Sequence, residues 1–181
     1  SLAGEPAQAL PWASQALALA RRIGFAYFLP HVHVELALIY LGLRQFEEAR
    51  RELDAARRLA LDHQDLAVLA AVHEATARLA LDEGDTARAR GEIATAARLC
   101  LEHDNVMTSA ALVLTATRLP GPDMPAGHWL DALMVLAEVQ QPVRRLAAAA
   151  RGLQGPEGIA SSPPPGLREL VAQVIVATGR A

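Results

Sequence analysis

The chain repeats itself with a period of 40 residues. Three segments starting at positions 4, 44 and 84 align without gaps, and several of their columns hold the same small or apolar side chain. The matching columns are Ala9, Ala49 and Ala89; Ala16, Ala56 and Ala96; Leu19, Leu59 and Leu99; and Ala20, Ala60 and Cys100. A fixed period of this length is typical of arrays in which each unit buries its apolar face against its neighbours.

Each unit predicts two helices. Hydrophobic residues make up 52% of the chain, mostly as Ala and Leu, and aromatic residues only 4%, which favours helices. In the second unit, apolar residues recur every three or four positions, at Leu36, Ile39, Tyr40 and Leu43 and again at Ala49, Leu53, Ala56 and Leu59. Gly84-Asp85 marks the turn inside a helix pair, and segments 63–65 and 103–105 mark the turns between units.

The aromatic and small residues of the second unit resemble the tetratricopeptide (TPR) signature. Its order and spacing are matched by Leu36-Ala37, Tyr40, Phe46, Ala49, Leu53 and Ala56. The usual TPR period is ~34 residues, so this chain is similar to the longer form found in MalT-like, large ATP-binding bacterial transcriptional regulators. The resemblance implies an all-α, right-handed α-solenoid of TPR-like helix pairs, excised from a larger regulator.

The repeat register holds over residues 1–119 and breaks afterwards. Residues 119–127 form an interruption rich in Pro and Gly, and Trp129 stands where the repeat predicts Ala. The remaining segment, 120–181, is predicted to hold a degenerate repeat, with short helices over 128–139 and 142–153, and a last amphipathic helix over 167–180. We expect it to form the irregular C-terminal helical cap that such an array needs.

The stretch VHEATARLA, residues 72–80, contains the first half of a zinc-hydrolase signature, His73-Glu74. That signature needs a second His four residues later, and Ala77 stands there. His73 also repeats His33, which indicates a packing role. His31 and Glu35 could share an ion, but two ligands are too few. We therefore expect no metal and no cofactor, and a protein that is not an enzyme.

Charge and cysteine content limit the kinds of partner and the cellular compartment that we expect for this chain. The formal net charge of −3 gives no general attraction to nucleic acid or to anionic membranes. Arg50-Arg51 and Arg57-Arg58 are interleaved with acidic residues and predict a solvated helix face. Cys100 is the single cysteine, which fits a reducing cytoplasm and predicts a buried, inert thiol. No apolar run reaches the ~18–20 residues that span a membrane.

The resemblance to TPR proteins also implies a binding surface. In that family the first helix of each unit lines a concave groove. The residues that this places in the groove are His31, Val34, Glu35, Leu38, Glu74, Arg78, Thr115 and Arg118. They predict a mixed-charge groove with an apolar floor, although the same side chains could simply solvate the inner wall. The Lys/Asn set that clamps a terminal carboxylate in chaperone-binding members is absent.

The predicted function is non-catalytic binding of a protein, a peptide or a small-molecule effector. One alternative is a structural scaffold or oligomerisation segment. Another is an enzyme whose site lies in 120–181, where Asp123, His128, Asp131 and Glu138 occur without any catalytic spacing. The first helix, from about position 5 to 22, is predicted to present Leu10, Ala13 and Leu17 to an upstream repeat or a second copy, as in a homodimer.

Overall fold

The computed structural model describes residues 6–102, 106–121, 127, 129 and 166–179. This part of the chain is entirely helical and contains no strand, which confirms the all-α prediction. The seven α-helices described are α1 (Pro6–Arg22), α2 (Leu29–Gly42), α3 (Phe46–Asp62), α4 (Leu66–Glu83), α5 (Thr86–Glu102), α6 (Val106–Ala116) and α9 (Leu167–Thr178). A short 3-10 turn, η1 (Ala26–Phe28), precedes α2.

The helix bounds follow the 40-residue period. Helices α1, α3 and α5 begin at positions 6, 46 and 86 and end at positions 22, 62 and 102. Helices α4 and α6 begin at positions 66 and 106. The repeat seen in the side chains is therefore also a repeat of the backbone, and α1 is the counterpart of α3 and α5.

The turns recur as well. Gly84 ends α4 in the left-handed conformation with φ of 82°, and Arg44, 40 residues earlier, has φ of 60°. The residue after each closes the same hydrogen bond, from Gln45 N to Tyr40 O at 2.9 Å and from Asp85 N to Ala80 O at 2.8 Å. Such a bond, next to a left-handed residue, is a common way to end a helix.

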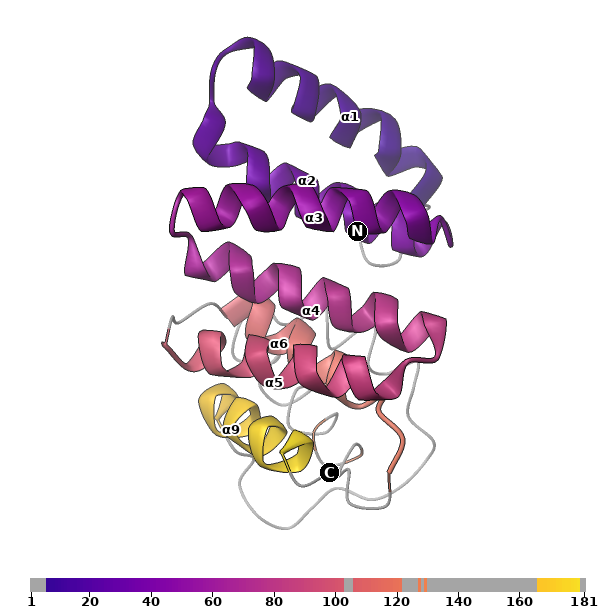
Figure 1. The fold of residues 1–181 in the computed structure, drawn as a ribbon, viewed down its shortest axis with the longest axis vertical. Helices are drawn as coiled ribbons and strands as arrows, with labels where there is room; N and C mark the ends of the chain where they lie inside the picture. The colour runs from indigo at the N-terminus through magenta and orange to yellow at the C-terminus, as the bar shows by residue number, and fades with distance from the viewer. Residues whose placement is uncertain (1–5, 103–105, 122–126, 128, 130–165, 180–181) are drawn as a thin grey trace.

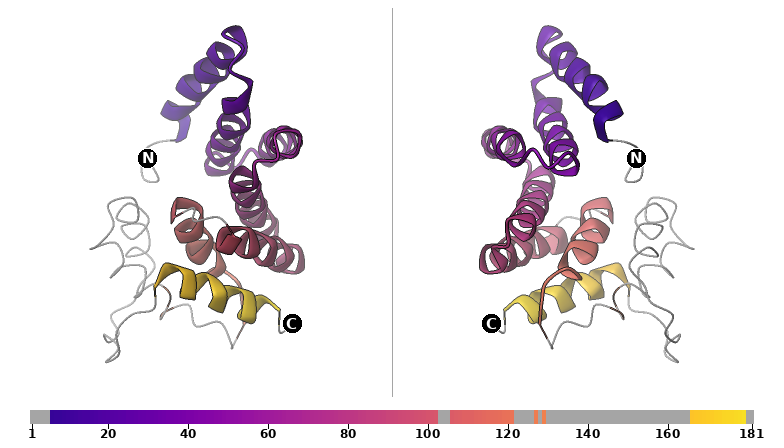
Figure 2. Two further views of the ribbon diagram at one scale, coloured as in Figure 1. Left: turned by 90° about the vertical axis from the view of Figure 1, so that its left-hand side faces the viewer. Right: turned by 90° about the vertical axis from the view of Figure 1, so that its right-hand side faces the viewer.

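The helices are stacked along the long axis of the molecule, with α1 at one end and α9 at the other, and with α6 at about the level of α5 (Figure 1). In the side views, α3 and α5 lie on one side of the stack, α2 and α6 lie on the opposite side, and α4 lies between them (Figure 2). Helix α4 contacts both α2 and α6, so the first helices of successive units touch directly. We call the side of the stack formed by this row of first helices its inner side.

Small residues lie at the centre of the helix pairs. Ala37, Ala49 and Ala56 are completely buried, and their small side chains allow α2 and α3 to approach closely. They belong to one apolar cluster formed by α2, α3 and α4. A second cluster joins α4, α5 and α6 to α9 and includes Trp129, which is completely buried and donates from Nε1 to Gln173 Oε1 at 3.0 Å.

The C-terminal predictions are answered in part. The expected last helix is α9, which packs on α5 and α6. Apart from Trp129, the short helices expected over 128–139 and 142–153 lie outside the described residues, as do Asp123, His128, Asp131 and Glu138. Among the described helices, none is both long enough and apolar enough to cross a bilayer.

Candidate functional site

A pocket of about 380 Å³ lies on the inner side of the stack. Its walls come from four parts of the chain that are far apart in sequence. They are Pro6 and Ala9 of α1; Glu35, Leu38, Ile39, Leu41 and Gly42 of α2; Arg78 and Asp82 of α4; and Arg118, which follows α6. We call this the inner pocket. Its volume lies within the range of small-molecule sites, roughly 300–1,000 Å³.

One wall of the inner pocket depends on the absence of a side chain at Gly42. A Cβ atom built there would lie 2.9 Å from Cγ of Pro6, closer than side chains normally approach. Gly42 therefore allows the start of α1 to rest against the end of α2. In the next unit Asp82 occupies the equivalent position and serves a different contact.

Arg78 lines the inner pocket, and two residues behind the pocket wall hold its side chain in place. Its Nε donates to Glu74 Oε1 at 2.6 Å and to Thr115 Oγ1 at 3.2 Å. The Thr115 hydroxyl in turn donates to the same Glu74 oxygen. Glu74 is only 3% exposed, so its charge is balanced inside the fold by Arg78. These contacts join α4 to α6 and hold the arginine in one orientation.

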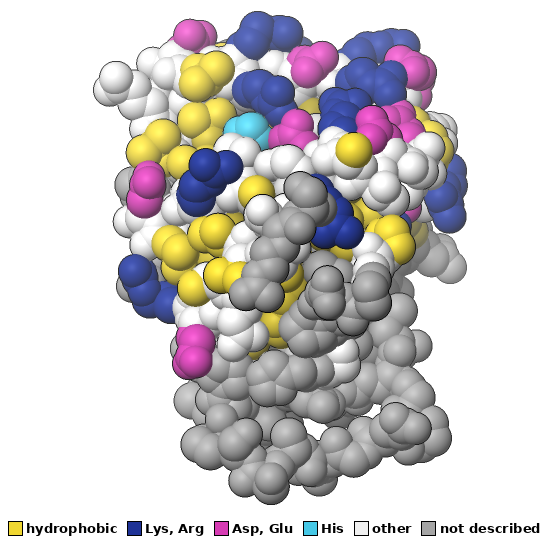
Figure 3. Space-filling view, turned by 60° about the horizontal axis from the view of Figure 1, so that its bottom comes forward, with side chains coloured by type: hydrophobic (Ala, Val, Ile, Leu, Met, Phe, Trp, Pro, Cys, Tyr) yellow, Lys and Arg dark blue, Asp and Glu magenta, His cyan; other side chains and the backbone are white. Residues whose placement is uncertain are grey.

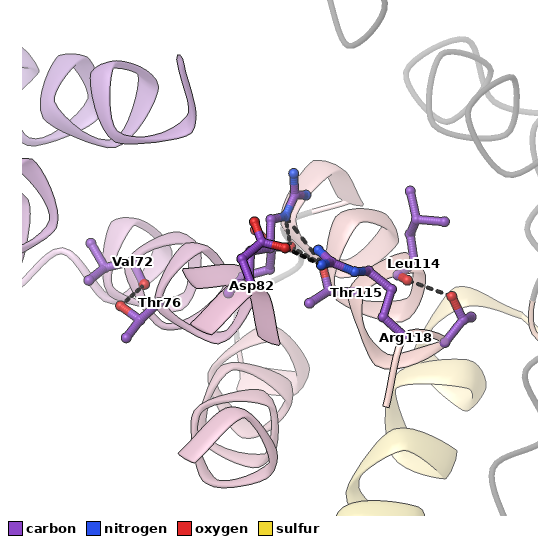
Figure 4. Close-up of polar contacts among 9 residues, drawn as sticks. Val72, Thr76, Asp82, Leu114, Thr115 and Arg118 are labelled. Atoms are coloured by element: carbon purple, nitrogen blue, oxygen red, sulfur yellow. Dashed lines mark hydrogen bonds and ion pairs between the residues drawn. The ribbon is translucent and has the colours of Figure 1, made fainter. Parts of the chain in front are cut away.

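A second ion pair crosses from α4 to the end of α6. Arg118 Nη2 donates to Asp82 Oδ1, and both side chains are partly exposed (Figure 4). Arg118 lies 40 residues after Arg78, so the two arginines occupy equivalent positions in successive units. Both are engaged by a carboxylate of α4, but one pair is buried and the other lies at the surface.

The structure places the eight predicted groove residues in four environments. Glu35, Leu38, Arg78 and Arg118 line the inner pocket. Glu74 and Thr115 lie behind it, where they hold Arg78. Val34 is buried in the apolar cluster of α2, α3 and α4. His31 lies away from the pocket lining, in an aromatic cluster at the start of α2.

His73 and Glu74 serve different contacts. Nδ1 of His73 lies 2.6 Å from Oε2 of Glu92 on α5, whereas Glu74 faces α6. One unit earlier, Nδ1 of His33 lies 2.5 Å from Oε2 of Glu52 on α3. Sequence reasoning found the repeated histidines but missed the carboxylates, which were visible as a second 40-residue column. Within the described residues, no group of three metal-ligating side chains comes together.

An aromatic cluster at the turn between α1 and α2 was also missed. The ring of Phe28 stacks between those of Phe25 and His31, at centroid distances of 5.8 Å and 5.6 Å. Tyr27 stacks on His63 at 6.0 Å and so ties this turn to the end of α3. The segment carries no periodic signal because its residues lie in a turn and not along one helix face.

The N-terminal end of the stack exposes apolar side chains. Leu10, Ala13 and Leu17, the residues predicted to form the open side of α1, are instead half-buried. The exposed ones are Trp12, Leu19, Ile23, Phe25, Tyr27 and Phe28. We call these six residues the N-terminal edge. Trp12 alone is 73% exposed, which is unusual for a side chain of this size.

Two further predictions concern the thiol of Cys100 and the arginines of α3. Cys100 is buried, and this burial raises the pKa of its thiol to about 11. Two of the arginines of α3 are paired with acids: Arg50 pairs with Glu47 and Glu83, and Arg57 lies within 3.9 Å of Glu92. On the face drawn in Figure 3, Arg and acidic side chains are interspersed and do not form a basic patch.

Comparison with known proteins gives no relative. No protein-family model, no curated protein and no solved structure matches this chain.

Proposed function

We propose that this chain is a non-catalytic binding domain built from TPR-like units, and that its ligand occupies the inner pocket. The array would be a right-handed α-solenoid, as in large bacterial transcriptional regulators, and would work in the cytoplasm. The recurrence of helix bounds, turns and His–Glu contacts at 40 residues supports the repeat part of this proposal.

The observation that carries the binding part is the fixed Arg78. A binding site needs polar groups whose positions are set before the ligand arrives. Arg78 lines the pocket while its Nε is held by a buried carboxylate and a hydroxyl. Burying Glu74 is costly unless its charge is paired. If Arg78 served only to keep this surface soluble, it would not need to be held by the buried carboxylate of Glu74.

Selection of random peptides displayed on phage tests this function. The bait would be the wild-type protein, and each selected peptide would be measured again on the variant Leu38→Trp, which fills the pocket. A second pocket-filling variant, Ala9→Leu, covers the case in which the first one is unstable. We expect the peptides to lose binding to both variants. Peptides that bind all three proteins equally would contradict the proposed site.

A second candidate function, assembly, is favoured by the N-terminal edge. Trp12 is equivalent to Glu52 and Glu92, and each of those carboxylates is contacted by the helix that precedes its own. The Trp12 face of α1 is thus the continuation of an interface that repeats along the stack. We propose that a second copy of the chain covers it, because a twofold contact would bury both apolar edges at once.

Sedimentation equilibrium tests the assembly candidate. We expect the wild type to form a dimer and the double variant Trp12→Ser, Leu19→Ser to be monomeric. The matched control is Leu61→Ser, which changes an exposed leucine on α3 outside the edge. A wild-type monomer at high concentration, or a dimer that persists in the double variant, would exclude this edge.

A further inference from the structure

The charges around the inner pocket leave one carboxylate unopposed. Of the four charged side chains that line it, Arg78 is paired with the buried Glu74, and Asp82 is paired with Arg118. Glu35 is exposed and makes no ion pair or hydrogen bond with the described residues. The pocket together with Glu74 therefore carries one net negative charge, and that charge lies at the α2 wall.

The surroundings of Glu35 are apolar. Leu38 and Ile39 follow it by three and four positions on α2, so their side chains neighbour its carboxylate along the helix surface. Pro6 and Ala9 of α1 extend the apolar wall. A ligand that meets Glu35 thus encounters a negative charge beside hydrocarbon, whereas its far end encounters the paired arginines of α4 and α6.

This combination selects a particular chemistry. An anion would meet two arginines whose charges are already balanced by Glu74 and Asp82, and the unopposed charge of Glu35 would repel it. A cation can approach Glu35 without breaking any contact among the described residues. The two arginines disfavour a second positive charge at the far end, while their remaining N–H groups can donate to a neutral oxygen.

Building on the proposed function, we propose that the inner pocket binds a monocation with an apolar body. Its amine or guanidinium group pairs with Glu35, and its hydrocarbon packs on Leu38 and Ile39. Two sources supply this chemistry: a Lys or Arg side chain of a peptide that is flanked by apolar residues, and a free small amine. Both give the same contact at Glu35.

The test is an NMR titration that follows the backbone amides of Glu35, Leu38 and Ile39. The probes are n-hexylamine, hexanoate and 1-hexanol, which share a hydrocarbon chain and differ in charge. The peptides acetyl-Leu-Lys-Leu-amide and acetyl-Leu-Gln-Leu-amide form the second pair. The variants are Glu35→Gln and, as a matched control, Asp54→Asn, an exposed carboxylate on α3 outside the pocket.

We expect hexylammonium to bind more tightly than hexanoate or hexanol. Glu35→Gln should weaken it about threefold or more, the range of an exposed ion pair, and Asp54→Asn should not. Tighter binding of the Lys peptide than of its Gln counterpart, lost in Glu35→Gln, assigns the cation to a peptide. Binding of the amine alone assigns it to a small molecule. Either result bears out the cation site.

The opposite outcomes separate this inference from the proposed function. If hexanoate or hexanol moves the pocket amides at least as strongly as hexylammonium, or if Glu35→Gln changes nothing, the cation assignment is wrong while the pocket still binds. If none of the probes moves these amides, the proposed binding function of the inner pocket is contradicted as well.

Discussion

Nδ1 of His73 on α4 lies 2.6 Å from a carboxylate oxygen of Glu92 on α5. Since a carboxylate can only accept, the histidine donates from Nδ1. The same contact joins α2 to α3 one unit earlier, through His33 and Glu52. A His–Glu hydrogen bond thus recurs between the two helices of a unit, at a position where both side chains are largely buried. We call each of these two contacts, His33–Glu52 and His73–Glu92, a clasp.

The clasp predicts energetic coupling inside each unit. A double-mutant cycle of His73→Ala and Glu92→Ala should give a coupling free energy of about 1–2 kcal/mol, as expected for a hydrogen bond to a charged group. Urea unfolding of the four proteins measures it. The control is a cycle between His33 and Glu92, which belong to different units and should not couple. Equal values in both cycles would refute the clasp.

Glu92 should also affect how the free energy of unfolding changes at acidic pH. Burial alone would raise its pKa, but the hydrogen bond from His73 and the positive charges of His73, Arg57 and Arg88 outweigh burial, so the pKa lies below the usual 4.5. On acidification the unfolded chain therefore takes up this proton first. The stabilisation is present above pH 4.5 and is lost as the pH falls through the lowered pKa.

The variant Glu92→Gln isolates that contribution. Urea midpoints measured between about pH 6 and pH 3 should fall less steeply for Glu92→Gln than for the wild type, because the variant cannot take up the proton. The other carboxylates titrate in both proteins and cancel in the comparison. Parallel curves would show that the pKa of Glu92 does not differ between the folded and unfolded states.

A strained turn residue offers a way to stabilise the protein. Gln64 lies between α3 and α4 with φ of 55°, and the equivalent residue one unit earlier is Gly24, with φ of 70°. A left-handed conformation costs a residue with a side chain about 1–2 kcal/mol. Gln64→Gly should therefore raise the free energy of unfolding, by up to about 1 kcal/mol once the greater freedom of the unfolded glycine is subtracted.

The matched control for this change is Gln15→Gly, at an exposed position within α1. There glycine should destabilise, by about 1 kcal/mol, because the backbone is helical and gains nothing from a missing side chain. Thermal unfolding of both variants gives the comparison. A loss of stability in Gln64→Gly similar to that in the control would mean that the turn carries no strain.

The Cys100 thiol should be inert in the folded protein. Because burial raises its pKa to about 11, little thiolate exists near pH 8, and a bulky reagent cannot reach it. Ellman's reagent should react slowly with the native protein and fully after addition of urea. Rapid reaction without urea would show that α5 opens locally or that the thiol is accessible.

The repeat and the core could be predicted because they depend on local periodicity. Ala49 and Ala56 were placed on the apolar face of a helix by their spacing, and both are completely buried. A turn at Gly84-Asp85 was expected between two apolar periods, and Gly84 ends α4 there. Such signals need only the geometry of single helices, which the order of residues specifies.

The partners across helices could not be predicted in the same way. His73 and Glu92 are 19 residues apart, and their meeting depends on how α4 crosses α5. The exposed side chains of α1 could not be predicted for a related reason. The half-burial of Leu17 and the exposure of Trp12 depend on how α1 lies against α2, which the period does not fix.

The residues of the candidate site could be predicted only in part. Glu35, Leu38, Arg78 and Arg118 were selected by family resemblance, and they line one pocket. Asp82 and Gly42 were not selected, because their roles arise from contacts with Arg118 and Pro6 that no motif records.

Chemical-shift mapping with a library of water-soluble organic fragments tests the central claim most directly. Cationic, neutral and anionic fragments would be added to the isotopically labelled protein, and the amides that move would be located on the fold. If ligands bind in the inner pocket, the amides whose chemical shifts change should be those of Leu38, Ile39, Leu41 and Arg78. Perturbations that gather elsewhere, or a library without a single binder, would contradict it.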